Sequence, residues 1–324
     1  MRVVITGAAG FIGSRFSEVL LEHAERLGYD DVVLLDALTY SGRRENLETA
    51  LADPRARFVH GSINDAALVD ETLASAQAVV HFAAESHVDR SISGARPFYE
   101  TNVLGTHQLL ESARSNVKRF VHVSTDEVYG SIASGSWRED HVLEPNSPYS
   151  SSKAGSDLAA LAYYRTFGLA VMVTRCSNNY GPRQFPEKVI PLFVTNLMDG
   201  LTVPLYGDGL NVRDWLHVDD HCRGILAVLE RGRVGEIYNI GGGTEITNRE
   251  LTSRLLKLCD RDESMIEAVE DRLGHDRRYS VDWSKARTEL GYSPQVDFDQ
   301  GLAATVQWYH ENESWWRPLK ARAS

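Results

Sequence analysis

Two groups of side chains in the sequence have the types and the spacing for proton transfer. Tyr149 and Lys153 are four positions apart at the start of an expected helix, so both can point to one side of it. A nearby ammonium lowers the pKa of a phenol, ordinarily about 10, and we expect Lys153 to act on Tyr149 in this way. The second group, Asp126 and Glu127, follows Thr125 at the end of an apolar run. Two carboxyl groups with different pKa values can serve as acid and base in one reaction.

A succession of apolar runs and helical patterns must position these side chains. We expect buried strands at residues 2–6, 32–35, 57–60, 78–82, 119–124 and 170–175, with helices within 10–27, 97–115 and 148–167. Near-continuous apolar runs are typical of parallel strands that are covered on both faces. The alternation predicts an α/β fold with a Rossmann-type doubly wound parallel sheet. The acid pair would then lie at the carboxyl end of a strand, where such folds bind their ligands.

After about residue 175 the pattern changes to shorter elements and turn-rich stretches such as "NNYGPRQFP", "YGDGLNVRD" and "IGGGTEITN". We therefore expect two parts. Residues 1–175 would form a Rossmann domain that carries the catalytic residues. Residues 176–324 would form a smaller α/β lobe, with some of its segments folding back onto the sheet.

The stretch "VVITGAAGFIGSRF" has the glycine spacing of a dinucleotide site, with Gly7, Gly10 and Gly13 between the first strand and the first helix. Glycines allow a tight turn and a close approach of the backbone to a pyrophosphate. The second strand ends in Asp36, whose carboxylate suits ribose hydroxyls and repels a 2′-phosphate. We interpret the motif as an NAD site rather than an NADP site. A structural turn and an ordinary turn acid are the alternatives.

Charge and cysteine usage limit the partners and the location of the chain. The formal net charge of −11 disfavours a nucleic-acid partner. Cys176, Cys222 and Cys259 are too dispersed for a disulfide framework, which favours a reducing compartment. No apolar run approaches the roughly 20 residues of a membrane helix, and "MRVVITG" lacks the features of a signal peptide. We expect a cytoplasmic protein without a membrane partner.

Two histidine pairs raise the question of a metal, namely His81 with His87 and His217 with His221. Neither pair is completed by a cysteine or an acid at zinc-site spacing, so we expect no metal. We interpret "HVDDH" as the start of a helix, with Asp219 or Asp220 as its cap.

Taken together, these motifs resemble the extended short-chain dehydrogenase/reductase superfamily and its NAD-dependent epimerase/dehydratase family. Within that family the sequence is similar to dTDP-glucose 4,6-dehydratases over nearly its full length. The similar stretches are "ITGAAGFIG", "HFAAESHVDRSI", "TNVLGT", "VSTDEVYG", "YSSSKA", "SNNYGPRQFPEKVIP", "PLYGDGLNVRDWLHVDD" and "DRLGHDRRYSVD". The glycine and Tyr/Lys motifs specify only the superfamily, whereas the Asp-Glu pair, "AAESHVDRS" and "GHDRRY" are narrower.

The resemblance implies a reaction in three stages. Tyr149, held by Lys153 and aided by Thr125, accepts the proton of the sugar 4-hydroxyl while a hydride moves from C4 to NAD. Glu127 then removes the C5 proton, and Asp126 protonates the C6 hydroxyl as it leaves as water. The hydride finally returns to C6 while Glu127 reprotonates C5, so NAD must stay tightly bound through the turnover.

The resemblance also assigns the binding residues. For the cofactor they are Gly7, Gly10, Phe11, Ile12, Gly13, Asp36, Leu38, Thr39, Ser62, Ile63, Phe82, Ala83, Ala84, Ser86, Thr101, Tyr149, Lys153 and Asn179. For the nucleotide-sugar substrate they are Ser86, Thr125, Asn178, Lys188, Pro204, Tyr206, Arg213, Asn248, Arg272 and His275. A guanidinium can bind two diphosphate oxygens at once, although a lone arginine is also common on a surface. Relatives pair through the helices at 97–115 and 148–167, which implies a homodimer.

Two positions depart from the family pattern, and two other functions stay open. Ser62 stands where the family usually has an acid facing the adenine, and Leu273 stands where it usually has proline. One alternative is a related enzyme, a nucleotide-sugar 4-epimerase or a UDP-sugar dehydratase. The other is a catalytically silent NAD-binding protein, although this chain retains Tyr149 and Lys153. Thymine and uracil differ by one methyl group, so the sequence leaves the base open.

Overall fold

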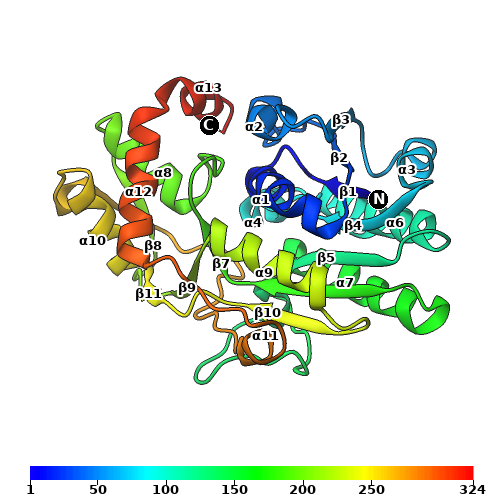
Figure 1. The fold of residues 1–324 in the computed structure, drawn as a ribbon. Helices are drawn as coiled ribbons and strands as arrows, with labels where there is room; N and C mark the ends of the chain where they lie inside the picture. Colours follow the sequence, from blue (N-terminus) through cyan, green and yellow to red (C-terminus); the bar gives the residue numbers. More distant parts are fainter. Residues whose placement is uncertain (324) are drawn as a thin grey trace.

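A seven-stranded parallel sheet forms the centre of the molecule in the computed structural model, which describes residues 1–323 (Figure 1). Its strands run in the order β10-β6-β5-β4-β1-β2-β3, and every neighbouring pair is parallel. Their bounds are β1 Arg2–Thr6, β2 Asp31–Asp36, β3 Ala56–His60, β4 Ala76–His81, β5 Arg119–Thr125, β6 Val171–Cys176 and β10 Ile237–Ile240. The six predicted strands and the Rossmann-type fold are confirmed.

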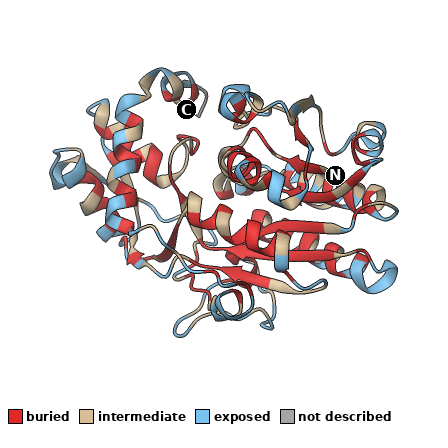
Figure 2. Cartoon of the chain, viewed as in Figure 1, coloured by how far each residue is buried: buried red, intermediate tan, exposed pale blue. Residues whose placement is uncertain are grey.

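Helices cover both faces of this sheet, which explains why its strands are almost wholly apolar. In β1, Val3 and Ile5 belong to the core on one face, whereas Val4 belongs to the core on the other. The first face is covered by α1 (Phe11–Leu27) and α9 (Val218–Arg231). The second is covered by α3 (Ala66–Leu73), α6 (Thr106–Ala113) and α7 (Pro148–Phe167). Figure 2 shows the resulting layer of buried residues along the strands.

Local signals set the ends of α7, the helix that carries Tyr149 and Lys153. Ser147 and Ser150 form a reciprocal capping box at its start, and Pro148 occupies the first turn. Gly168 ends the helix with a left-handed φ of 70°. The predicted helical segment at 97–115 consists of α5 (Arg96–Tyr99), a π-helical stretch (Glu100–Gly105) and α6.

The second half of the chain builds a smaller lobe beside the sheet. It contains the three-stranded sheet β11-β9-β7 and the parallel pair β12-β8. The strands are β7 Asn178–Tyr180, β8 Val203–Tyr206, β9 Val212–His217, β11 Glu245–Thr247 and β12 Ile266–Val269. The helices are α8 Val189–Met198, α10 Asn248–Leu258, α12 Phe298–Glu311 and α13 Glu313–Ala323. By contrast, α9, β10 and α11 (Ser284–Leu290) return to the central sheet.

The remaining elements are short. They are α2 (Glu48–Leu51), α4 (Val88–Ser93) and 3₁₀ turns at Arg44–Leu47, Asp126–Tyr129 and Glu263–Met265. Across residues 1–323, no helix has both the length and the apolar character needed to span a membrane.

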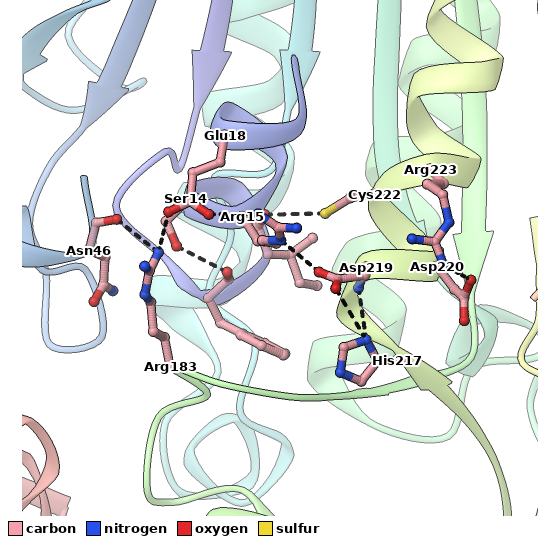
Figure 3. A network of polar contacts seen from close by, with 12 residues as sticks. Ser14, Arg15, Glu18, Asn46, Arg183, His217, Asp219, Asp220, Cys222 and Arg223 are labelled. Carbon is pink, nitrogen blue, oxygen red and sulfur yellow. Dashed lines mark hydrogen bonds and ion pairs between the residues drawn. The ribbon is translucent and has the colours of Figure 1, made fainter. Parts of the chain in front are cut away.

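The start of α9 corrects one prediction. Its N-cap is His217, which has extended dihedral angles and whose Nδ1 accepts a hydrogen bond from the Asp219 backbone N–H (3.2 Å). Asp219 and Asp220 lie inside the first turn, where a carboxylate still favours the helix dipole but cannot act as the cap. Asp219 instead accepts a hydrogen bond from Arg15 Nε on α1 (2.6 Å), as Figure 3 shows.

Candidate active site

A cleft of about 320 Å³ lies where the parallel strands of the central sheet end. Its wall follows the carboxyl ends of β1 to β6 and continues onto the loop after β7. Most of the predicted site residues line it. These are Gly7, Gly10, Phe11, Ile12, Gly13, Asp36, Thr39, Ser62, Ile63, Phe82, Ala83, Ala84, Ser86, Thr101, Thr125, Asp126, Glu127, Tyr149, Lys153, Asn178, Asn179 and Lys188.

The glycine-rich loop leaves no room for side chains at two of its positions. A Cβ on Gly7, whose φ is 66°, would lie 2.6 Å from the backbone nitrogen of Ala83. A Cβ on Gly13 would lie 2.2 Å from the carbonyl oxygen of Gly7. The loop therefore packs backbone against backbone, and it leads into the free N–H groups at the start of α1.

Asp36 is held in place by the backbone around it. Its two oxygens accept hydrogen bonds from the N–H groups of Ala9 (2.9 Å) and Leu38 (2.7 Å). Burial raises the pKa of this carboxyl, and the two N–H groups oppose the rise. Leu38 itself lies outside the lining of the cleft, in a left-handed conformation with φ of 51°.

Tyr149 and Lys153 are both buried on the side of α7 that faces the cleft. The Lys153 ammonium donates to the carbonyl oxygen of Val123 in β5 (2.9 Å), and burial lowers its pKa to about 8. Burial raises the pKa of Tyr149 well above 10, and the charge of Glu127 adds to the rise. The predicted lowering of the phenol pKa by Lys153 is therefore wrong for this structure. Desolvation of the phenolate dominates, and the ammonium is directed at a carbonyl.

The acid pair sits in a tight turn directly after β5. Glu127 donates its backbone N–H to Thr125 Oγ1 (3.3 Å), which fixes the start of the 3₁₀ turn. Asp126 is 2% exposed, and its Oδ2 has no hydrogen-bond partner within the described chain. Burial raises the pKa of Asp126 well above its usual range, and the neighbouring Glu127 charge adds to the rise. Asp126 is thus set up to hold a proton.

Glu127 has different surroundings. Burial also raises its pKa, but the positive charges of Arg272, Lys188 and Arg213 oppose the rise. Cations favour the ionised form of a carboxyl group, so Glu127 is the better candidate for a base. The two adjacent acids therefore differ in the charges that face them, as acid–base division of labour requires.

Six predicted substrate residues lie beyond the lining of the cleft, on the smaller lobe. Arg213 donates to the carbonyl oxygen of Asp276 (2.9 Å) and stacks over Tyr279. Arg272 pairs with Asp89 (3.4 Å). The six are Pro204, Tyr206, Arg213, Asn248, Arg272 and His275. The positive charges of Arg213 and Arg272 nevertheless act to lower the pKa of Glu127, which links this surface to the cleft.

The structure places the two residues that depart from the family pattern, Ser62 and Leu273. Ser62 lines the cleft, and its Oγ accepts the backbone N–H of Asn64 (3.1 Å). Leu273 is 77% exposed in the loop beside Arg272. Neither side chain contacts the acid pair.

Sequence reasoning missed most of a segment that crosses the cofactor side of the cleft, which we call the strap (residues 181–188). Arg183 donates to Glu18 (2.7 Å) and to the carbonyl oxygen of Asn46 (3.2 Å) on one side (Figure 3). On the other side Glu187 accepts hydrogen bonds from Tyr40 and Arg90, both at 2.9 Å. The turn-rich "NNYGPRQFPEK" marked this loop, but its long-range partners leave no local signal in the sequence.

Within residues 1–323, no three or more His, Cys, Asp or Glu side chains lie together in a way that could hold a metal ion. His81 instead contacts the hydroxyls of Thr6 (2.7 Å) and Thr106 (2.9 Å), and His221 contacts Asn179 (2.9 Å).

The fold and the site define a Rossmann-type protein of the nucleotide-sugar dehydratase and epimerase class. The chain belongs to the GDP-mannose 4,6 dehydratase family, whose model matches residues 4–305. It is 60% identical to a dTDP-glucose 4,6-dehydratase of Streptomyces antibioticus, with 99% of this chain and 96% of the relative covered. It is 58% identical to a protein of the same name from an Actinoplanes species, with coverages of 98% and 100%. The predicted resemblance to dTDP-glucose 4,6-dehydratases is confirmed.

Solved structures agree with this placement. The dTDP-glucose 4,6-dehydratase DesIV of Streptomyces venezuelae, crystallised with NAD, superposes with a TM-score of 0.97 at 63% identity, covering 98% of this chain and 100% of that one. A UDP-glucuronic acid 4-epimerase of Bacillus cereus, also solved with NAD, has a TM-score of 0.90 at 29% identity, with coverages of 96% and 99%. The fold is thus common to both activities, and the site must distinguish them.

Proposed function

We propose that this chain is a dTDP-glucose 4,6-dehydratase, a hydro-lyase that uses NAD as an internal oxidant. It oxidises C4 of the sugar, eliminates water across C5 and C6 and returns the hydride to C6. The product is dTDP-4-keto-6-deoxyglucose, a precursor for deoxysugar biosynthesis. The observation that carries this proposal is the Asp126–Glu127 pair, with Asp126 fully buried, which shares one cleft with Tyr149 and Lys153.

The cofactor side of the cleft fits NAD. The backbone-lined loop at Gly7 and Gly13 leaves space for a pyrophosphate, and the first turn of α1 faces it with free N–H groups. Each Asp36 oxygen has a lone pair left for a ribose hydroxyl after its bond to Ala9 or Leu38. NAD bound here supplies the acceptor, and later the donor, of the hydride. The strap accounts for tight retention of the cofactor through a turnover.

The protein side chains then divide the proton transfers. Tyr149 accepts the proton of the 4-hydroxyl in its phenolate form, which the positive charge of bound NAD together with Lys153 would favour against the burial that raises its pKa, with Thr125 as the second group near that hydroxyl. Glu127 takes the proton from C5, because three cations favour its ionised form. Asp126 donates its proton to the departing C6 hydroxyl, because burial keeps that carboxyl protonated above its usual range.

The smaller lobe supplies the nucleotide end of the substrate site. Arg213, Arg272 and Lys188 bring positive charge toward the cleft and suit the diphosphate. Asn178 has a buried side-chain oxygen without a hydrogen-bond partner inside residues 1–323, which suits a sugar hydroxyl. Pro204, Tyr206, Asn248 and His275 would surround the base and its ribose. In this division residues 1–175 bind NAD and carry the catalytic groups, and residues 176–324 mainly bind the nucleotide sugar.

The assembly we propose is a cytoplasmic homodimer. Large apolar side chains lie exposed along α5, the following π-helical stretch and α7, including Tyr99 (42%), Leu104 (61%) and Leu158 (57%). Helices that pair across a two-fold axis would bury them. Light scattering of the wild type and of Leu104→Glu tests this, since the charged variant should give the mass of a single chain.

The activity is tested by incubating the protein with dTDP-glucose in deuterated water and recording mass and proton spectra. Loss of water with one deuterium at C5 is the expected result. Recovery of the C4 epimer without loss of water, with UDP-glucose as a parallel substrate, would instead assign an epimerase. Unchanged sugar together with tightly bound NAD would point to a silent relative.

A further inference from the structure

A buried pair of opposite charges lies behind Lys153, outside the lining of the cleft. Asp157 follows Lys153 by one turn of α7, and Arg175 belongs to β6. The two residues are 0% and 2% exposed, and Arg175 Nε donates to Asp157 Oδ2 (2.9 Å). Because positions four apart share one face of a helix, the Asp157 carboxylate and the Lys153 ammonium lie on the same side of α7.

The surroundings of the pair hold both charges in place. His122 in β5 lies 3.3 Å from Asp157 Oδ1, and burial lowers its pKa to about 4, so the ring is neutral near pH 7. The Arg175 guanidinium lies 4.7 Å from the ring centre of Tyr129, whose hydroxyl donates to Asn239 (2.9 Å). Burial raises the pKa of Asp157, but the charge of Arg175 and the His122 contact outweigh it and bring it to about 2.

Stability alone is a weak reason to keep such a pair. A buried ion pair is often replaced by apolar residues without loss of stability, because desolvation offsets the attraction. A functional reason follows from Lys153, whose ammonium is buried with a single hydrogen bond, to Val123. Burial lowers its pKa to about 8, and the charge of Asp157 is the largest influence in the opposite direction.

The other ionisable groups near Lys153 contribute little negative charge. They are His81 from β4, His122 from β5 and Cys176 from β6; Arg175 borders His122, and Asp126 and Tyr149 line the cleft with Lys153. Burial raises the pKa values of Asp126, Cys176 and Tyr149, which favours their neutral forms. Asp157 is therefore the ionised acid that supports the Lys153 ammonium.

We propose that Asp157 and Arg175 are positioning residues of the active site: Asp157 keeps Lys153 charged beside Tyr149, and Arg175 keeps Asp157 ionised and fixed. The inference rests on the proposed function, since it concerns the lysine beside the proposed base.

The test is a direct titration of Lys153 in the full-length protein. The chain has six lysines, so labelling with [ε-¹³C]lysine gives a simple NMR spectrum, and Lys153→Met identifies the signal. Asp157→Asn retains an oxygen that accepts from Arg175 but removes the charge. The Lys153 midpoint should fall by about one pH unit in this variant. Asp260→Asn, the same change in an exposed turn, should leave the midpoint unchanged.

The same variant gives a kinetic readout. With dTDP-glucose, kcat at pH 8 should fall roughly fivefold with little change in KM, and the alkaline limb of the kcat–pH profile should move to lower pH together with the Lys153 midpoint. Asp157→Glu, which keeps the negative charge, should retain most of the wild-type activity. A Lys153 midpoint in Asp157→Asn that equals that of the wild type would overturn the inference, whatever happens to activity.

A second variant covers the case in which Asp157→Asn does not fold. Asp157→Asn with Arg175→Met removes both charges, so no guanidinium is left buried without its partner. Its Lys153 midpoint should still fall, because the charge of Asp157 acts on Lys153 more strongly than the charge of Arg175 does. The titration needs no turnover, so a lowered midpoint in the variant together with a wild-type protein that does not dehydrate dTDP-glucose would contradict the proposed function and leave this inference standing.

Discussion

Trp315 donates its indole N–H to the side-chain oxygen of Asn46 (2.9 Å), across 269 positions of the sequence. The amide of Asn46 in turn donates to the carbonyl oxygen of Ala9 in the glycine-rich loop (2.9 Å), and Arg183 of the strap binds its backbone oxygen. One residue, Asn46, thus connects helix α13, the strap and the proposed pyrophosphate site. Figure 1 shows α13 beside α2, next to this point.

The first prediction follows from this connection. Trp315→Phe keeps an aromatic side chain but loses the indole N–H and its hydrogen bond to Asn46, which is worth about 1 kcal/mol. We expect NAD to leave roughly five times faster, while dehydration under saturating NAD changes little. The measurement is the rate of NAD loss after rapid dilution, followed by cofactor fluorescence. Trp308→Phe, in which the neighbouring tryptophan of α12 is changed, serves as the control and should retain NAD as the wild type does.

A second prediction separates the roles of the two acids. Glu127→Gln should lower kcat by about 10²–10⁴-fold, because no base remains for the C5 proton. Reduction of bound NAD by dTDP-glucose should persist, since the C4 oxidation does not use Glu127. Absorbance at 340 nm in a single turnover measures this step.

Asp126→Asn is the matched variant for that experiment. This variant should eliminate water from the substrate as slowly as Glu127→Gln does. It should still exchange the C5 proton with deuterated solvent, because Glu127 is intact. If both variants lost C5 exchange to the same extent, the assignment of base and acid would be contradicted.

A third prediction concerns stability rather than rate. Burial raises the pKa of Asp126 in the folded protein, so between the unfolded and folded pKa values the folded state binds more protons than the unfolded state. Stability therefore falls as pH rises through this range. Asp126→Asn removes the buried acid and should raise Tm by roughly 2–4 °C at pH 8 for each 1 kcal/mol recovered, with a smaller gain at pH 4. Calorimetry at the two pH values checks the sign.

A fourth prediction tests cofactor choice. Asp36→Asn keeps one oxygen to accept from the backbone but loses the negative charge that faces the ribose. The Kd for NAD should rise about tenfold, and the preference for NAD over NADP should narrow. Isothermal titration with each dinucleotide measures both effects. Asp31→Asn, at the opposite end of β2 from Asp36, is the control and should leave the NAD to NADP ratio unchanged.

The sequence predicted the parts of the molecule that leave a local pattern. Apolar runs marked the strands, and glycine spacing and Tyr149/Lys153 marked the cleft. The strap contacts and the Trp315–Asn46 bond escaped prediction because their partners are distant in the sequence. The pKa of Tyr149 was predicted in the wrong direction because a spacing rule shows a nearby cation but not the depth of burial. His217 was overlooked as a cap because the acids that follow it are the commoner capping residues.

The edge strand β10 has a consequence for how this protein is made. Its residues, Ile237–Ile240, pair with β6, which is complete some 60 positions earlier. During synthesis on a ribosome, the apolar edge of β6 therefore stays uncovered until well over two hundred residues have emerged. The catalytic half cannot complete its sheet before residues 176–240, close to half of the substrate lobe, have been made. Exchange of that lobe between relatives by recombination near residue 175 would thus also replace the last strand of the catalytic sheet.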